Sequence, residues 1–283
     1  MCRHLAHLGP PSTLSALLTE PAHALLRQSW APVDMRDGGT VNADGFGAGW
    51  YPAPGAEPVR YRSDRPMWSD ASFASIAAAT SSGAVLAAVR SATVGMPVVA
   101  TAAAPFAEGR WLFSHNGVVR GWPHSVTALA GRLPVADLLT LDAPTDSATL
   151  WALVRHGLRA GREPGVVLAR VVTDVAAAAP GSRLNLLLTD GTAIWATAWD
   201  HALSVRSHPA ATGPGPSSAL GAGAAVTVVS EPFDDRPGWE AVPDRHLLRA
   251  APGRYQLDAL TTVGRDNGDG SDHAAAGDRM GIR

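Results

Sequence analysis

The second residue of the chain, Cys2, combines two groups that could perform catalysis. Removal of an initiator methionine is expected before a small residue, and it would leave Cys2 with a free α-amino group beside its thiol. An α-amine has a reference pKa of about 7.7–8.0, so a useful fraction is neutral near pH 7 and can accept the thiol proton. One residue would then supply both nucleophile and base. The alternative is a small buried thiol, since a lone cysteine is weak evidence.

The dipeptide Asn116-Gly117 follows a strand-like run, Trp111 to Ser114. Asn-Gly after a strand is ordinarily a turn signal. An oxyanion hole, however, also needs a side-chain amide donor beside an unobstructed backbone N–H, and Asn followed by Gly supplies both. Both interpretations stay open from the dipeptide alone.

Two charged residues stand where elements are expected to begin or end. Arg90 directly follows an apolar run, Ala84 to Val89, and a guanidinium at a strand end can bind a carboxylate through two hydrogen bonds. The alternative for Arg90 is a surface salt bridge. Asp146 precedes a helical pattern, so it is a candidate N-cap and also a candidate partner for a substrate ammonium group. Both roles of Asp146 can hold at once.

Two other patterns are weaker. Residues 42–50 contain three glycines at alternate positions, which is a poor phosphate loop because no helix clearly follows. Those glycines could instead let the strand approach the N-terminal nucleophile closely. A metal site from Cys2, His4 and His7 is disfavoured, because in a strand Cys2 and His4 share one face while His7 points the other way.

The elements that must position these residues follow from apolar periodicity and turn residues. Ser12 is the expected N-cap of a first short helix, and Asp70 caps a second that ends near Ala79. The remaining helices are expected at 146–158 and 166–177. Strands are expected at 1–10, 45–51, 59–62, 84–89, 111–114, 184–189, 192–199, 202–207 and 226–230. Because strands and helices do not alternate regularly, the order favours a layered α+β fold with antiparallel sheets.

Composition narrows the class of protein. The 283 residues have a net charge of −2 and no run of Lys and Arg, which argues against nucleic-acid binding. The single cysteine cannot form an internal disulfide. No targeting segment is evident, and no apolar stretch approaches the roughly 20 residues of a membrane span. We therefore expect a soluble cytoplasmic protein with a single domain over 2–260, a flexible insert at 209–223 and a disordered tail at 264–283.

Taken together and in order, Cys2, the Asp44-Gly45-Phe46-Gly47 strand, Arg90, Asn116-Gly117 and Asp146 resemble the class II glutamine amidotransferases, a branch of the N-terminal-nucleophile hydrolases. Within that group the chain looks most like the amidohydrolases of ergothioneine biosynthesis. The segments that carry this second resemblance are 1–6, 28–32, 89–97, 230–235 and 242–246, so it runs from residue 1 to about residue 250.

The resemblance implies an αββα sandwich of two antiparallel sheets, a thioester intermediate, and neither cofactor nor metal. By position, Cys2 would be the nucleophile, and Asn116 and Gly117 would form the oxyanion hole. Arg90 would bind the α-carboxylate of a glutamyl group, and Asp146 its α-ammonium. The small-molecule substrate would be γ-glutamyl-hercynylcysteine sulfoxide, from which glutamate is removed.

Two aromatic residues complete the expected substrate contacts. Phe46 stands where many amidotransferase domains have Trp, so an aromatic ring is retained there. Hercynyl compounds carry a trimethylammonium group, and aromatic faces attract such cations. Trp30 is the first candidate for that contact, although most of the nine tryptophans are expected to serve packing.

Two other functions share these residues. A glutaminase subunit could deliver ammonia to a separate synthase, although the absence of room for a synthase domain after residue 260 favours the hydrolase. A non-catalytic binding module could keep the glutamyl pocket, in which case Cys2→Ala would leave its function intact. The sequence pattern sets no oligomeric state.

Overall fold

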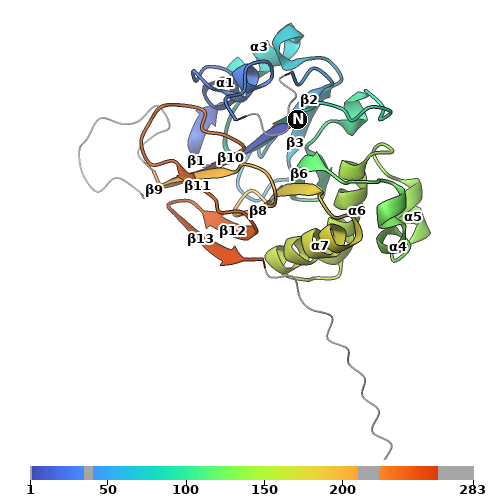
Figure 1. Ribbon diagram of the computed structural model, residues 1–283. Helices are drawn as coiled ribbons and strands as arrows, with labels where there is room; N and C mark the ends of the chain where they lie inside the picture. The colour runs from blue at the N-terminus through green and yellow to red at the C-terminus, as the bar shows by residue number, and fades with distance from the viewer. Residues whose placement is uncertain (1, 35–40, 210–222, 261–283) are drawn as a thin grey trace, which may run out of the picture.

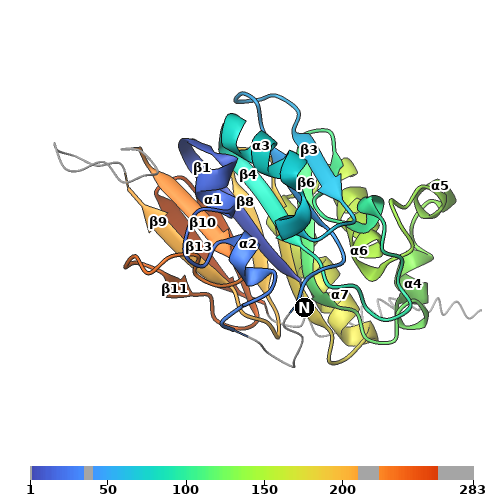
Figure 2. The same ribbon diagram turned by 90° about the horizontal axis from the view of Figure 1, so that it is seen from above.

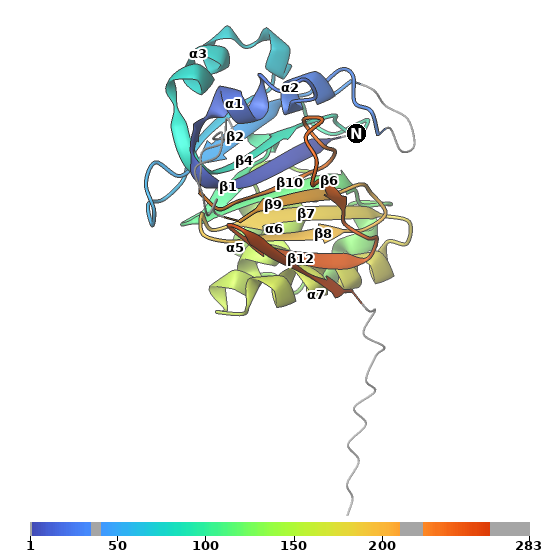
Figure 3. The same ribbon diagram turned by 90° about the vertical axis from the view of Figure 1, so that its left-hand side faces the viewer.

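The computed structural model describes residues 2–34, 41–209 and 223–260. Two antiparallel β-sheets are stacked face to face, and helices cover the outer face of each sheet (Figure 1, Figure 3). This arrangement confirms the expected αββα sandwich. The expected insert and tail fall outside the described residues, except for Pro209 and Gly223.

The first sheet has seven strands in the order β11-β9-β10-β1-β4-β2-β3. Their bounds are β1 Arg3–Thr13, β2 Phe46–Trp50, β3 Val59–Ser63, β4 Ser81–Val89, β9 Ser204–His208, β10 Ala225–Val229 and β11 Glu240–Ala241. The second sheet has six strands in the order β13-β12-β8-β7-β6-β5. Their bounds are β5 Phe106–Glu108, β6 Trp111–Val118, β7 Arg183–Thr189, β8 Ile194–Ala198, β12 His246–Ala251 and β13 Arg254–Ala259.

The helices form two outer layers. Those over the first sheet are α1 Leu14–Leu18, α2 Leu25–Gln28 and α3 Ala71–Ala79 (Figure 2). Those under the second sheet are α4 Thr127–Ala130, α5 Val135–Leu139, α6 Asp146–Arg159 and α7 Pro164–Ala178 (Figure 3). Short 3₁₀ turns η1 Met67–Ser69, η2 Ala100–Ala102 and η3 His124–Val126 lie in the connections.

The side chains of the central strands alternate between the helix-covered face and the face between the two sheets. Successive side chains of a strand point to opposite faces. On β4, Val85 and Ala87 pack against the helices α1 and α3, whereas Ala84 and Leu86 pack between the sheets. Because both faces of β1 and β4 are covered, the backbone of the first sheet's centre is fixed, and the site residues at its end start from a rigid support.

Local capping sets the helix starts. Asp70 accepts the Phe73 N–H as predicted. The first helix, however, is capped by Thr13, because Ser12 still pairs with Ser82 in the sheet. The α6 helix is capped by Thr145, whose hydroxyl accepts the Ala148 N–H. The N-cap interpretation of Asp146 was therefore wrong by one residue, which leaves its carboxylate directed to other partners.

The strand β6 runs four residues further than predicted, through Val118. Asn116 and Gly117 consequently pair with Asn185 and Leu184 of β7 instead of forming a turn. A Cβ at position 117 would lie 1.9 Å from the carbonyl oxygen of Arg183, so only glycine fits. The turn interpretation of Asn-Gly was wrong, because strand pairing overrides local turn preference.

Candidate active site

Cys2 lies at the beginning of β1, at one end of the first sheet. Arg3 pairs with Val89 of β4, which places Cys2 opposite the end of that strand. The half-buried thiol donates to the carbonyl oxygen of Ser91 at 3.7 Å, and the Cys2 carbonyl oxygen accepts from Nη1 of Arg3 at 3.1 Å. The only cysteine is thus held at a sheet end that also carries two arginines.

Arg90 follows β4 and is 9% exposed. Its guanidinium Nη1 donates to the carbonyl oxygens of Pro97 (2.9 Å) and Asp44 (3.4 Å). The Asp44 carboxylate accepts the N–H of Ala92, and Arg90 forms no ion pair with any described residue. Arg90 is therefore a nearly buried cation, adjacent in sequence to the Ser91 carbonyl that accepts the thiol. Its own partners are neutral carbonyls, so it retains attraction for an anion.

Asn116 is tied to the cysteine strand by one hydroxyl. Its side-chain amide donates to Oγ of Ser230 at 3.0 Å. The same hydroxyl accepts the backbone N–H of His4 at 2.9 Å, and the Ser230 N–H donates to the His4 carbonyl oxygen. An amide NH₂ has two hydrogens, so Asn116 keeps a second donor beyond this contact. The two sheets are thus joined two residues from Cys2.

Asp146 is 4% exposed, and backbone N–H groups hold both of its carboxylate oxygens. Oδ2 accepts from Val119 at 3.0 Å, and Oδ1 accepts from Ser147 at 2.7 Å. No cationic side chain among residues 2–34, 41–209 and 223–260 pairs with it. It lies in the first turn of α6, where the helix dipole stabilises a negative charge.

Buried imidazoles fill the space behind these residues. Nδ1 of His4 lies 3.2 Å from Oγ of Ser114, and burial, together with the nearby His115, His201 and Arg3, lowers the pKa of His4 to about 3. His115 lies within hydrogen-bond distance of Ser147, and burial lowers its pKa although the Asp146 carboxylate opposes the shift. Burial therefore favours the neutral form of both rings, and no contact among the described residues joins either imidazole to the Cys2 thiol.

The side chains of the two aromatic candidates contact other aromatic residues. Phe46 is completely buried in the core of the first sheet, where its ring packs against Tyr61 and Phe73. Its ring is part of the core, and its expected contact with the substrate stays a prediction. The Trp30 ring meets the edge of Trp68 at 5.6 Å and the guanidinium of Arg27. No described contact joins Trp30 to Cys2.

The glycines of β2 serve packing between layers. A Cβ at Gly47 would lie 2.4 Å from the carbonyl oxygen of Ala104, and one at Gly49 would lie 2.7 Å from a Leu112 methyl group. The expectation that these glycines admit the N-terminal nucleophile was wrong, because the atoms nearest to a Cβ at each of them belong to residues 61–64, 103–105 and 112, and none belongs to Cys2.

A cavity of about 490 Å³ opens beside Ser230. Carboxylates dominate its charged lining, which consists of Asp34, Glu231, Asp234, Asp235 and Asp244 with His23 and His201. Because Ser230 also binds Asn116, this acidic cavity begins one side chain away from the Asn116 amide.

Three residues in this region had no predicted role: Arg3, Ser230 and Glu231. They stood within the segments 1–6 and 230–235 that carried the resemblance, which was the only signal available. Within the described ranges, no helix is long and apolar enough to cross a membrane, and no three His, Cys, Asp or Glu side chains are grouped as a metal site.

The chain is similar to known proteins over most of its length. The family model for class II glutamine amidotransferases matches residues 22–213. A γ-glutamyl-hercynylcysteine sulfoxide hydrolase of Mycolicibacterium smegmatis is 42% identical over 249 residues, which cover 88% of this chain and 95% of that protein. A protein of the same name from Mycobacterium tuberculosis is 40% identical over 92% of this chain and 97% of its own.

Solved structures share the fold. A glutamine aminotransferase class-II domain protein from Silicibacter pomeroyi superposes with a TM-score of 0.62 at 24% identity, covering 92% of this chain and all of that one. The glutamine phosphoribosylpyrophosphate amidotransferase of B. subtilis gives 0.58 at 12% identity, covering 92% of this chain and 49% of its own.

Proposed function

The chain belongs to the class II glutamine amidotransferase family, and from this premise we propose that it hydrolyses the γ-glutamyl amide bond of γ-glutamyl-hercynylcysteine sulfoxide. The observation that carries the proposal is the identity of 40–42% over at least 95% of two proteins that bear this activity as their name. The products would be glutamate and hercynylcysteine sulfoxide, made in ergothioneine biosynthesis.

The glutamyl head would be held by Arg90 and Asp146, two buried charged groups that form no ion pair among the described residues. The Arg90 guanidinium, supported by carbonyl oxygens only, would bind the α-carboxylate. The Asp146 carboxylate, supported by two backbone N–H groups, would bind the α-ammonium. Fixing both ends of the amino-acid head places the δ-carbonyl carbon before attack and lowers the entropic part of the barrier.

The reaction would begin when the Cys2 α-amine accepts the thiol proton, which requires that Met1 has been removed. The sulfur then attacks the δ-carbonyl carbon, and the free hydrogen of the Asn116 amide and the Gly117 N–H stabilise the oxyanion. Loss of one such donor typically raises a barrier by about 3–4 kcal/mol. The α-ammonium of Cys2 then protonates the leaving nitrogen, and water hydrolyses the thioester to release glutamate.

The acidic cavity beside Ser230 would receive the leaving half of the substrate. A trimethylammonium group is a permanent cation, and five carboxyl side chains line the cavity. Three of them, Glu231, Asp234 and Asp244, also face arginines, whereas Asp235 lies 3.5 Å from His23. Opposite charges at a partly enclosed surface attract more strongly than in bulk water. Trp30 does not line this cavity, so the proposed site for the hercynyl half moves from Trp30 to these carboxylates.

The test measures glutamate release by the purified protein with three substrates: γ-glutamyl-hercynylcysteine sulfoxide, γ-glutamylcysteine and glutamine. We expect kcat/KM for the first to exceed that for each of the others by about 100-fold, because only the first fills the cavity. Intact-mass analysis of the same protein should show Met1 absent, and Cys2→Ala should abolish turnover. Equal use of glutamine would favour a glutaminase, and a fully active Cys2→Ala variant would overturn the proposal.

A further inference from the structure

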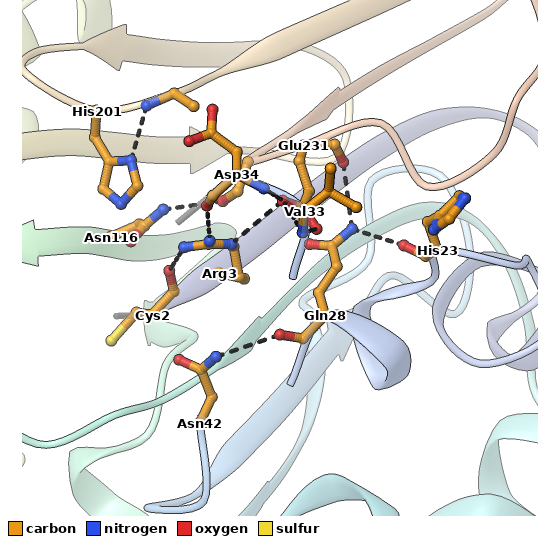
Figure 4. A network of polar contacts seen from close by, with 12 residues as sticks. Cys2, Arg3, His23, Gln28, Val33, Asp34, Asn42, Asn116, His201 and Glu231 are labelled. Carbon is orange, nitrogen blue, oxygen red and sulfur yellow. Dashed lines mark hydrogen bonds and ion pairs between the residues drawn. The ribbon is translucent and has the colours of Figure 1, made fainter. Parts of the chain in front are cut away.

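Arg3 is an unusual residue to find behind a nucleophile, because it is a cation that is only 1% exposed. Its guanidinium Nη1 donates to the carbonyl oxygen of Cys2 at 3.1 Å, and Nη2 donates to the carbonyl oxygen of Asp34. Its Nε lies 4.0 Å from a carboxylate oxygen of Glu231 (Figure 4). A buried guanidinium persists only when it is paired and hydrogen-bonded in this way.

Glu231 is equally buried, at 4% exposure, and it organises the other side of the same network. Its carboxylate accepts the backbone N–H of Asp34 at 2.7 Å and that of Val33 at 3.1 Å. The carbonyl oxygen of Asp34 in turn accepts from Arg3. Glu231, the 33–34 backbone and Arg3 therefore form one closed unit, and Figure 4 shows the guanidinium between this loop and Cys2.

The terminal position of Cys2 makes this contact consequential. A chain end frays unless something ties it down. In the proposed mature protein no residue precedes Cys2, and the strand pairing begins only at Arg3. A hydrogen bond to the Cys2 carbonyl fixes the rotation about its Cα–C bond. The α-amine and the thiol-bearing Cβ both branch from that Cα, so this rotation sets where both reacting groups point.

We infer that Arg3 and Glu231 are positioning residues for the N-terminal nucleophile: the buried ion pair holds the Cys2 carbonyl and thereby aims the amine and thiol at the glutamyl site. The inference rests on the proposed function for its reaction, but the effect on Cys2 itself can be measured without any substrate. The same unit includes the wall of the acidic cavity, since Val33, Asp34 and Glu231 all line it.

The chain offers a matched control in a second buried pair. Arg155 is 8% exposed, and it donates to the carbonyl oxygen of Asp137 (3.1 Å) and to its carboxylate (3.3 Å). It thus combines a carbonyl and a carboxylate partner, as Arg3 does. It lies on α6 under the second sheet, and none of its contacts involves Cys2 or the cavity.

The experiment compares Arg3→Lys and Glu231→Gln with Arg155→Lys and Asp137→Asn. One readout is the rate at which iodoacetamide alkylates the thiol, which is unambiguous because Cys2 is the only cysteine. The others are kcat and KM for glutamate release, and the melting temperature. An ammonium group cannot span the partners of a guanidinium fork. We expect Arg3→Lys to lower the alkylation rate and kcat about tenfold, with KM changed less than about twofold.

Glu231→Gln should give a smaller loss of the same kind, and it serves as the second probe if Arg3→Lys does not fold. The control variants should lower the melting temperature to a similar extent while alkylation and kcat stay within about twofold of wild type. Equal losses of alkylation and kcat in the Arg3 and Arg155 variants, or no loss in the Arg3 and Glu231 variants, would overturn the inference. Reduced alkylation in a protein whose wild type releases no glutamate would instead uphold positioning and reject the proposed substrate.

Discussion

Arg3 begins β1 and Arg90 directly follows the adjacent strand β4, at the same end of the first sheet, and both contact the immediate surroundings of Cys2. Arg3 binds the Cys2 carbonyl and is paired with the buried carboxylate of Glu231. Arg90 stands next to Ser91, whose carbonyl accepts the thiol, and binds only the carbonyl oxygens of Asp44 and Pro97. Both guanidinium groups are buried. Arg3 has an opposite charge nearby, whereas Arg90 has none among the described residues.

This difference distinguishes an arginine that stabilises the fold from one that can bind a ligand. Burying a guanidinium costs several kcal/mol per ion, and a nearby carboxylate offsets that cost within the folded protein. Where the offset is missing, as at Arg90, an anionic ligand would supply it on binding. The same reasoning applies to Asp146, which has backbone donors but no cation. Arg90 and Asp146, the buried charges without an ion pair among the described residues, are therefore the groups we propose to bind the zwitterionic glutamyl head.

The largest effect is expected from Arg90→Met compared with Arg3→Met. Hydrogen bonds to charged groups are worth about 1.5–3 kcal/mol each, so loss of two at Arg90 should lower kcat/KM about 10³-fold. Its unfolding free energy should fall by about 1–3 kcal/mol, because two hydrogen bonds to carbonyl oxygens are lost but no ion pair is broken. Arg3→Met leaves Glu231 buried without its partner and should cost about 3–5 kcal/mol. Glutamate release and urea unfolding measure both; an inactive, strongly destabilised Arg90→Met would contradict the distinction.

Asp146→Asn should have the next largest effect and should show both kinds of loss. An amide cannot bind the substrate ammonium as a carboxylate does, so we expect kcat/KM to fall about 10²-fold. Either the Val119 or the Ser147 N–H would also face the new NH₂ group, which costs about 1–2 kcal/mol of stability. Steady-state kinetics with thermal melting tests this. If stability falls while kcat/KM is retained, Asp146 serves only to hold the start of α6.

The sequence predicted roles for Arg90 and Asp146 but not for Arg3. Arg90 and Asp146 were identified because each ends or begins an element whose periodicity is local: the apolar run of β4 and the amphipathic face of α6. The layered fold followed from the same local patterns and from the order of the elements. The boundaries were less secure, as Thr145 rather than Asp146 caps α6.

The contacts that hold Cys2 in place could not be predicted, because the residues that form them are far apart along the chain. Arg3 meets Glu231, and the His4 backbone meets Ser230, only after β10 has paired with β1. No periodicity reports such a contact. The surroundings of Phe46 could not be predicted for a related reason, since an aromatic residue in a glycine-rich strand can face either the core or a ligand, and the structure packs its ring against Tyr61 and Phe73.

Ser230→Ala tests whether the Ser230 hydroxyl positions the Asn116 amide, the proposed oxyanion donor. Its hydroxyl binds both the Asn116 amide and the His4 N–H, so its loss frees the amide to rotate. We expect kcat to fall about tenfold, which is less than removal of the donor itself, with KM nearly unchanged. Ser114→Ala is the matched control, because it removes a hydroxyl that contacts only the His4 ring. Equal effects of the two variants would show that Ser230 acts through His4 and not through Asn116.

The smallest effect is expected at His7, which is buried in its neutral form, unlike the charged Arg3 and Arg90. His7 of β1 is fully buried beside Thr227, and burial, then Arg206 and His208, lowers its pKa to about 4 from about 6.5 in the unfolded chain. The unfolded state therefore binds the extra proton between these values. Stability is complete above pH 6.5 and is lost as the pH falls toward 4.

For His7 alone this loss amounts to about 2 kcal/mol between pH 8 and pH 5. His7→Gln keeps a hydrogen-bonding side chain but cannot titrate, so its unfolding free energy should depend on pH less steeply than that of wild type by about this amount. Urea unfolding from pH 8 to pH 5 measures the two slopes. Parallel slopes would mean that His7 has the same pKa in the folded and unfolded states. A buried imidazole next to a neutral hydroxyl would then still take up a proton below pH 6.5, and burial beside neutral partners would no longer distinguish Arg90 as the anion-binding group.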